Sequence, residues 1–280
     1  MKVRIVSDTT SGLPQELGAR LGIPILPQIV IFGGDSYRDD IEMDTATFLV
    51  RLKASRALPK TAAPPPAFYN PIYQKILSDG EAAIVLGPSA KLSGTVRSAE
   101  LAAQDFPGAD IRVIDTLTNA GNLATLVLLA DEVAKAGEEA DQVVAKIQEW
   151  MPRQRTYFLV DTLEYLQKGG RIGGAKALLG EMLQIKPILV LQDGQAEVYE
   201  QQRTQRRARQ RLIEIVEEQC PHGPEAHLCV MHADALEAAR SLVADLQSGL
   251  RLEQVPIYEL PPAIVVHAGP GTLAVGFFSR

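Results

Sequence analysis

The sequence predicts an α/β protein built from two α/β domains. In the first half, short apolar runs rich in β-branched residues alternate with stretches of helical periodicity, and the expected strands are 3–7, 23–32, 82–87 and 111–115. The expected helices are 44–54, 68–78, 94–104 and 119–136. Strands that alternate with helices are joined by right-handed crossovers and form a parallel sheet. We therefore expect a mostly parallel, Rossmann-like sheet in this half.

The second half of the chain predicts a mixed sheet. Segment 156–161 has the pattern of a strand, and 186–203 predicts a hairpin because Asp193-Gly194 between two alternating runs favours a type I′ turn. Further strands are expected at 226–233, 255–261 and 263–278, with a helix at 234–248. The boundary between the halves is expected near residue 155, which gives domains 1–155 and 156–280.

Composition excludes several classes of function. The net charge of the 280 residues is −6, and so acidic a chain lacks the positive surface typical of nucleic-acid-binding proteins. The basic cluster at 203–211 is either a solvated helix face or a functional patch. No apolar run reaches the roughly 18 residues that a membrane span needs. Cys220 and Cys229 lack metal or redox spacing, and segment 1–8 lacks the apolar core of a signal peptide. We expect reduced thiols and a cytoplasmic protein.

Ser93 is a candidate site residue because it stands where strand 82–87 gives way to the next helix. Ligands of parallel sheets bind in such loops, at the carboxyl ends of the strands, and Asp8 ends the first strand in the same way. The Ser93 hydroxyl has three interpretations: a helix cap, an anion ligand that Gly94 lets approach closely, or a nucleophile. The nucleophile interpretation lacks the first glycine of the G-x-S-x-G pattern.

The glycine cluster at 169–176, GGRIGGAK, does not complete a nucleotide motif. A P-loop requires lysine directly after its last glycine, but Ala175 stands there and Lys176 comes one residue late. The cluster follows a helical pattern, whereas both nucleotide motifs follow a strand. Arg171 within the cluster is therefore either a surface arginine or an anion-binding side chain.

Two further polar residues stand beside turn-forming sequence. His267 ends an apolar run, at the end of an expected strand and before a Gly-Pro-Gly bend, where its imidazole either donates to an anion or makes a structural hydrogen bond. Thr61 precedes a proline-rich segment and is either a ligand contact or a turn former. His227 and His232 lie on opposite faces of one strand, so we expect no metal site.

Five blocks of the chain, in order, carry a resemblance to a known family: IVSDTTSGLP, LSGTVRSAE, FLVDTLEYLQKGGRI, GQAEVYEQQRT and VVHAGPGTLAVGF. Together they resemble the DegV family of bacterial fatty-acid-binding proteins. The resemblance covers the whole chain, and it implies a long-chain fatty acid such as palmitate, stearate or oleate bound in a tunnel between two α/β domains. It implies neither a catalytic activity for the chain alone nor a cofactor.

The resemblance also implies roles for particular residues. Ser93 matches the serine, and Thr61 the threonine, that hold the ligand carboxylate, although Ala62-Ala63 stand where the family usually has Ser-Gln. His267 matches the histidine before Gly-Pro-Gly, and Gly94 belongs to the same carboxylate site. Three more matched residues lie around the site or on a partner surface: Asp8, Arg171 and Arg203.

Members of this type are similar to the binding subunit of bacterial fatty acid kinase. The resemblance therefore implies a partner, an ATP-binding kinase subunit that converts the presented acid to an acyl phosphate. Two alternatives stay open from the sequence: a carrier or sensor without a kinase, and a serine hydrolase that uses Ser93.

Overall fold

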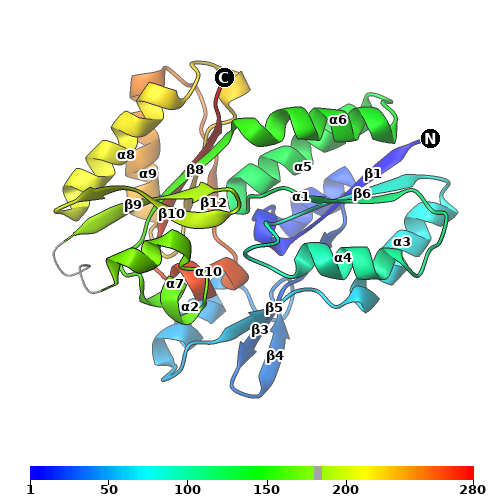
Figure 1. Cartoon of the computed structure of the whole chain (residues 1–280), viewed down its shortest axis with the longest axis horizontal. Coiled ribbons are helices and arrows are strands. Elements are labelled where there is room, and N and C mark those ends of the chain that lie inside the picture. The colour runs from blue at the N-terminus through cyan, green and yellow to red at the C-terminus, as the bar shows by residue number, and fades with distance from the viewer. Residues whose placement is uncertain (180–184) are drawn as a thin grey trace.

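The computed structural model describes residues 1–179 and 185–280, and these residues form three sheets (Figure 1). The first is parallel and four-stranded, in the order β2-β1-β6-β7, and the second is six-stranded, in the order β10-β9-β8-β13-β11-β12. The third is small and antiparallel, in the order β4-β3-β5. The α/β class predicted from the sequence is confirmed.

The parallel sheet is covered by helices on both faces, as buried β-branched strands require. Its strands are β1 (Val3–Asp8), β2 (Ile25–Leu26), β6 (Ala82–Gly87) and β7 (Ile111–Asp115). Tyr69 and Tyr73 of α3 (Pro66–Ser78) pack on one face together with α4 (Thr95–Ala103). The other face is covered by α1 (Gln15–Leu21), α5 (Ala120–Lys135) and α6 (Ala140–Trp150).

The six-stranded sheet is mixed, because β11 and β12 pair in parallel whereas its other neighbouring strands, among the described residues, pair antiparallel. Its strands are β8 (Gln154–Leu159), β9 (Lys186–Gln192), β10 (Gln195–Gln202), β11 (Cys229–His232), β12 (Ile257–Glu259) and β13 (Leu273–Phe278). One face packs against α8 (Gln205–Gln219) and α9 (Leu236–Leu250). The opposite face carries Phe158, Met231 and Ala274, which pack toward α10 (Pro262–Ala268). This inner face is the one that positions the site.

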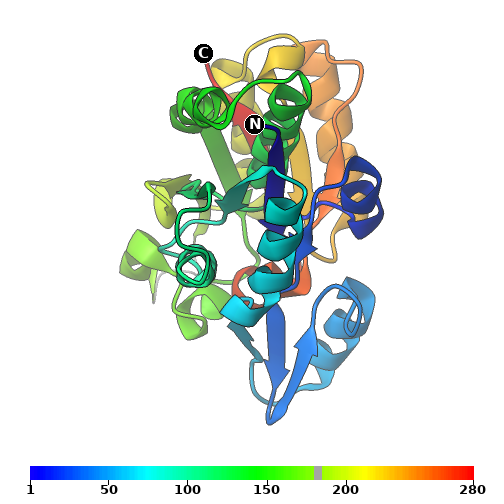
Figure 2. The same cartoon turned by 90° about the vertical axis from the view of Figure 1, so that its right-hand side faces the viewer.

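The small sheet was not predicted from the sequence. It consists of β3 (Ile29–Phe32), β4 (Asp35–Arg38) and β5 (Lys60–Ala62), and it lies below the two larger sheets with α2 (Thr45–Ala54) (Figure 2). The expected strand 23–32 is therefore wrong in its extent, since it divides into β2 and β3, which belong to different sheets. Pro27 falls at the break, and proline removes a donor that a continuous strand would use.

The described residues also form five short helical elements. They are α7 (Glu164–Lys168) and the 3₁₀ segments η1 (Thr9–Ser11), η2 (Met151–Arg153), η3 (Gly173–Leu178) and η4 (Pro224–Ala226). The predicted turn between β9 and β10 is confirmed, because Asp193 and Gly194 both have the positive φ of a type I′ turn. The expected strand 263–278 is wrong over its first half, where α10 forms instead.

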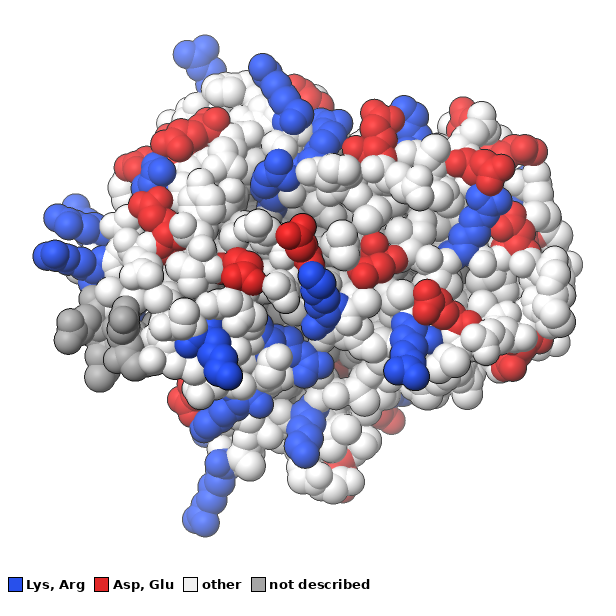
Figure 3. Space-filling model, viewed as in Figure 1, with Lys and Arg blue, Asp and Glu red and all other residues white. Residues whose placement is uncertain are grey.

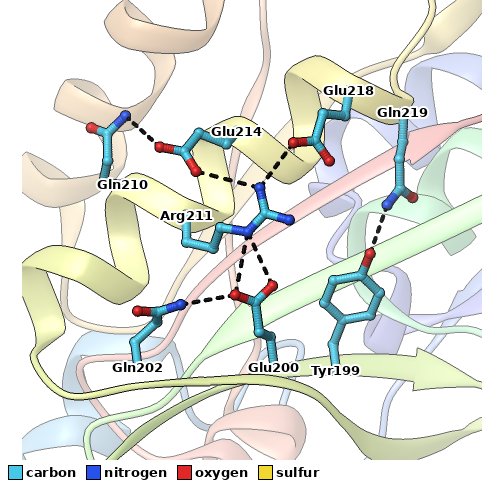
Figure 4. A network of polar contacts seen from close by, with 8 residues as sticks. All are labelled: Tyr199, Glu200, Gln202, Gln210, Arg211, Glu214, Glu218 and Gln219. Atoms are coloured by element: carbon cyan, nitrogen blue, oxygen red, sulfur yellow. Dashed lines mark hydrogen bonds and ion pairs between the residues drawn. The ribbon is translucent and has the colours of Figure 1, made fainter.

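The basic cluster at the start of α8 is accompanied by acidic side chains. Figure 3 shows positive side chains at the left edge, where α8 begins, with negative ones interspersed over the same region. Arg211 lies between Glu200 of β10 and Glu214 and Glu218 of its own helix, at 2.9–3.3 Å from their carboxylate oxygens (Figure 4). The contacts of Arg211 are those of a solvated helix face, and whether the rest of the cluster forms a functional patch stays open.

Candidate functional site

A cavity lies where β5, the loop between β6 and α4, and α10 meet the inner face of the six-stranded sheet. Its unfilled space is about 890 Å³, including the part open to solvent. A second cavity beside η2 and the β9–β10 hairpin contains none of the residues predicted from the sequence.

The lining of the first cavity is apolar over most of its surface, with a few polar side chains. Apolar lining residues include Phe158, Leu166, Met231, Leu260 and Ile264. The polar lining residues include Thr10, Gln28, Thr61, Ser93, Arg171 and His267. An apolar enclosure with few polar groups fits an amphiphile, whose polar head those groups would orient.

Ser93 lies in the loop before α4, and its position is held by backbone contacts. Its N–H donates to the Ser89 carbonyl at 3.0 Å, and the Ser89 hydroxyl donates to the Gly194 carbonyl of the hairpin turn at 2.6 Å. The Ser93 hydroxyl lies 2.7 Å from the Thr95 hydroxyl and weakly accepts the Thr95 N–H at 3.3 Å. The hydroxyl therefore partly caps the helix and also faces the cavity.

Thr61 lies in β5, opposite Val30 of β3, and not in the turn that the sequence favoured as one interpretation. Its hydroxyl is 2.9 Å from Nε2 of His267, so two side chains 206 positions apart in sequence meet at the cavity wall. His267 lies in the last turn of α10, which corrects its expected place at the end of a strand.

The hydrogen-bonding state of His267 follows from its surroundings. Burial, with a smaller contribution from the nearby Arg171 charge, lowers its pKa to about 4, so the ring is neutral at pH 7. Nδ1 is buried without a hydrogen-bond partner among the described residues. A buried N–H group without an acceptor is rarer than a buried acceptor without a donor. We therefore assign the single ring proton of neutral His267 to Nε2. His267 then donates to Thr61, and the Thr61 hydroxyl is left to donate into the cavity.

Arg171 brings a positive charge to the same wall. Its Nε donates to the Leu92 carbonyl at 2.9 Å, and its Nη1 donates to the Gly169 carbonyl at 2.7 Å. Burial lowers the pKa of Arg171, although a guanidinium stays protonated in proteins. The contact with Leu92 also ties the loop that carries Ser93 to the second half of the chain.

The other predicted residues lie outside the cavity wall. Gly94 is the N-cap residue of α4 with φ −78°, and a Cβ there would meet Ala63 only at ordinary contact distance. Asp8 is buried behind the cavity, and Arg203 is exposed just before α8. The structure therefore brings Thr61, Ser93, Arg171 and His267 to one cavity wall, of which these three residues are not part.

Sequence reasoning missed Gln28 and Thr95. The Gln28 side-chain amide donates to Asp8 Oδ1 at 2.8 Å and to Thr95 Oγ1 at 2.9 Å. Gln28 is 2% exposed, and a buried glutamine is rare enough to attract attention once burial is known. Nothing in the local sequence Leu-Pro-Gln-Ile marks this residue, because its partners come from β1 and α4.

Two buried carboxylates stand behind the site. Asp39 Oδ1 accepts from the Thr9 hydroxyl at 2.7 Å and from the Gln28 N–H at 2.8 Å. Burial, and to a smaller extent the neighbouring Asp8, raises the pKa of Asp39 to about 7. Burial also raises the pKa of Asp8, with hydrogen bonds from Thr10 and Gln28 acting in the opposite direction.

Within residues 1–179 and 185–280, no group of three or more His, Cys, Asp or Glu side chains is arranged to hold a metal ion. Over the same residues, no helix has the length and apolar character of a membrane span. Cys220 and Cys229 are both free and buried.

Comparison with known proteins places the chain in a family. The sequence model of the family described as "Uncharacterised protein, DegV family" matches residues 2–280. The chain belongs to the DegV family. A DegV domain-containing protein of Deinococcus radiodurans is 36% identical over 275 residues, which cover 98% of each chain. A DegV domain-containing protein of Streptomyces coelicolor is also 36% identical, over 99% of each chain.

Solved DegV structures have the same fold. A DegV family protein of Thermus thermophilus, described as binding fatty acid, is 34% identical and superposes with a TM-score of 0.90 over 100% of both chains. DegV of Bacillus subtilis, described as a fatty acid binding protein, is 28% identical with a TM-score of 0.89, again over 100% of both chains.

The close approach of Gly169 to His267 generates a first prediction. A Cβ on Gly169 would lie 2.2 Å from His267 Nδ1, so Gly169→Ala should displace the imidazole and separate it from Thr61. We expect a loss of about 1–3 kcal/mol in the free energy of unfolding, measured with urea. Gly34→Ala is the matched control, because nothing lies within 4 Å of a Cβ there. Equal stability of the two variants would contradict the packing of His267 against Gly169.

The raised pKa of Asp39 generates a second prediction. Between pH 4 and pH 7 the folded state keeps a proton on Asp39 that the unfolded state releases, so stability should fall as pH rises through this window. The Asp39→Asn variant should show a smaller fall in melting temperature from pH 5 to pH 8 than the wild type. The Asp8 carboxyl, whose pKa burial also raises, is unchanged in the variant and contributes to the remaining slope.

The control for this measurement is Asp35→Asn, which removes an exposed carboxylate on β4. This variant should retain the wild-type pH profile. An Asp39→Asn profile parallel to that of the wild type would show that Asp39 is not the titrating group.

Proposed function

We propose that the chain binds a long-chain fatty acid such as palmitate, stearate or oleate, with the carboxylate held by Thr61 and Ser93. The observation that carries the proposal is the presence of both hydroxyls, with Arg171 and His267, on the wall of one largely apolar cavity. The Thermus thermophilus and Bacillus subtilis relatives, described as binding fatty acid, support the class of ligand.

The physical chemistry of the cavity agrees with such a ligand. Burying about 14 methylenes at roughly 0.8 kcal/mol each gives about 11 kcal/mol of favourable binding free energy, before the opposing terms are subtracted. Lost translational freedom and desolvation of the head group remove several kcal/mol of this. The apolar wall therefore supplies most of the affinity, and the polar groups orient the head. Arg171 offsets the carboxylate charge, which would otherwise be costly to bury.

We further propose that the bound acid is presented to a separate ATP-binding kinase subunit, which converts the carboxylate to an acyl phosphate. The chain's own glycine cluster follows α7 and enters η3, and this helix–turn context is not that of a phosphate-binding loop. Phosphoryl transfer depends mainly on positioning and on charge neutralisation. A carboxylate fixed by two hydroxyls beside Arg171 meets both needs.

The serine-hydrolase alternative lacks support at Ser93. A nucleophilic serine needs a base within hydrogen-bonding distance. Among the described residues, the hydrogen bonds of the Ser93 hydroxyl go to Thr95, and His267 is bonded to Thr61. A carrier or sensor without a kinase shares the proposed ligand site and differs only in the fate of the bound acid.

Fatty acid binding is tested with native mass spectrometry and calorimetry. Purified wild-type protein should carry one long-chain acid, and after delipidation it should bind one palmitate. The double variant Thr61→Val, Ser93→Ala should bind palmitate at least about tenfold more weakly, because it lacks both hydroxyl donors to a charged group. Ser241→Ala, which removes an exposed hydroxyl on α9, should bind as the wild type does. Failure of the delipidated wild type to bind palmitate, stearate or oleate would overturn the proposal.

Presentation to a kinase is tested with an ATP-binding fatty acid kinase subunit, ATP and radiolabelled palmitate, with acyl phosphate trapped by hydroxylamine. We expect hydroxamate only when the chain is present. The single variant Ser93→Ala should lower the rate more than it lowers palmitate occupancy, since the hydroxyl orients the head. Palmitate bound at full occupancy without any hydroxamate would favour a carrier or sensor.

A further inference from the structure

A line of hydrogen bonds runs from Asp8, through Gln28 and Thr95, to the hydroxyl of Ser93. Asp8 Oδ1 is 2.8 Å from Gln28 Nε2, which is 2.9 Å from Thr95 Oγ1, and this oxygen is 2.7 Å from Ser93 Oγ. Asp8, Gln28 and Thr95 are each at most 2% exposed. Water therefore does not compete for the two hydrogen bonds of the Gln28 amide, and each of its hydrogens depends on the acceptor that the fold provides.

The direction of this line is set at the Asp8 end. Asp8 Oδ1 accepts both the Thr10 N–H and the Gln28 amide, so Oδ1 is an acceptor whether or not a proton resides on the other oxygen. The Gln28 amide nitrogen has two hydrogens and no capacity to accept. One hydrogen goes to Asp8, and the other goes to Thr95 Oγ1.

The direction of the hydrogen bonds is set in the same way at Thr95 and at Ser93, which lines the cavity. Thr95 Oγ1 accepts from Gln28, and within the described part of the chain its own hydrogen has one acceptor in reach, Ser93 Oγ. Ser93 Oγ then accepts from the Thr95 hydroxyl and, weakly, from the Thr95 N–H. With its accepting positions engaged, the Ser93 hydroxyl points its own hydrogen into the cavity that it lines.

We propose that Gln28 is a positioning residue that, through Thr95, forces the Ser93 hydroxyl to donate to an anionic head group. The inference rests on the proposed fatty acid site and adds the reason why that site selects a carboxylate over a neutral head. Without the line, the Ser93 hydroxyl is free to donate to Thr95 Oγ1, and an anionic head group would have to break that hydrogen bond before Ser93 could donate to it. The unfavourable free energy of orienting the Ser93 hydroxyl then arises when the protein folds and not when the ligand binds.

The backbone of Gln28 is fixed as firmly as its side chain. Its N–H donates to Asp39 Oδ1 at 2.8 Å and its carbonyl accepts the Asp39 N–H at 3.0 Å. This pairing holds the side chain between β1 and α4, where it reaches both Asp8 and Thr95. A methionine has nearly the same length and shape as glutamine but no amide hydrogens, so Gln28→Met removes the orientation with little change in packing.

The experiment compares a carboxylate ligand with a neutral ligand of equal chain length. Dissociation constants for myristate and 1-tetradecanol are measured by calorimetry for the wild type and Gln28→Met. We expect Gln28→Met to weaken myristate about tenfold, the scale of a hydrogen bond to a charged group, and to weaken tetradecanol less than about twofold. An alcohol head both donates and accepts, so it adapts to either orientation of Ser93.

Two further variants separate orientation from general damage. Thr95→Val interrupts the same line of hydrogen bonds and should show the same selective loss of affinity for myristate. This variant tests the proposal even if Gln28→Met is too unstable to purify. Thr125→Val removes a buried hydroxyl that donates to the Gly121 carbonyl within α5, and it should leave the ratio of the two dissociation constants unchanged. In a Ser93→Ala background, Gln28→Met should cause no further loss of myristate affinity.

The outcomes are distinct. Equal weakening of both ligands by Gln28→Met and Thr95→Val, or losses that add to that of Ser93→Ala, would overturn the positioning role and leave fatty acid binding intact. A wild-type protein that binds neither myristate nor palmitate would overturn the proposed function and this inference together.

Discussion

The amide of Gln28 has only two hydrogens, and the fold assigns one to Asp8 and the other to Thr95. Because a buried donor must find an acceptor, this assignment determines the direction of the hydrogen bonds that reach Ser93. His267 acts on Thr61 in a similar way from the opposite part of the chain, since its neutral ring donates through Nε2. Both hydroxyls are thus prepared as donors before a ligand arrives.

The two halves of the chain are both needed for this arrangement. Thr61 and Ser93 come from the first half, whereas Arg171 and His267 come from the second half. The loop of Ser93 is tied to the second half through Ser89 and Gly194 and through Leu92 and Arg171. A change in the relative placement of the halves would therefore alter the polar and the apolar parts of the cavity wall together.

Local signals made much of the fold predictable. The turn at Asp193-Gly194 and the crossovers of the parallel sheet depend on short-range sequence, and the structure confirms them. The small sheet was missed because β5 is short and pairs with β3 only through tertiary contacts. His267 was placed in a strand because the apolar run before it suits either element. Pro262 at the first position of α10 was the signal for a helix start.

The site was predictable where hydroxyls, arginine and histidine follow recognisable motifs, and less so where contacts are long-range. Ser93, Thr61, Arg171 and His267 line one cavity, and their role in holding a ligand stays a prediction. Gln28 and Thr95 carry no motif of their own. Their importance emerges only when strands and helices distant in sequence bring Asp8, Gln28 and Thr95 into one buried line.

Oriented donors and the Arg171 charge should hold the proposed ligand as an ionised carboxylate. Carbon-13 NMR of carboxyl-labelled palmitate bound to the protein, followed as a function of pH, measures this ionisation. Donors and the Arg171 charge should keep the bound carboxyl ionised, with its pKa below the ordinary carboxyl value of about 4.3. A bound carboxyl whose pKa lies above that value would show that the apolar wall prevails and would contradict the account.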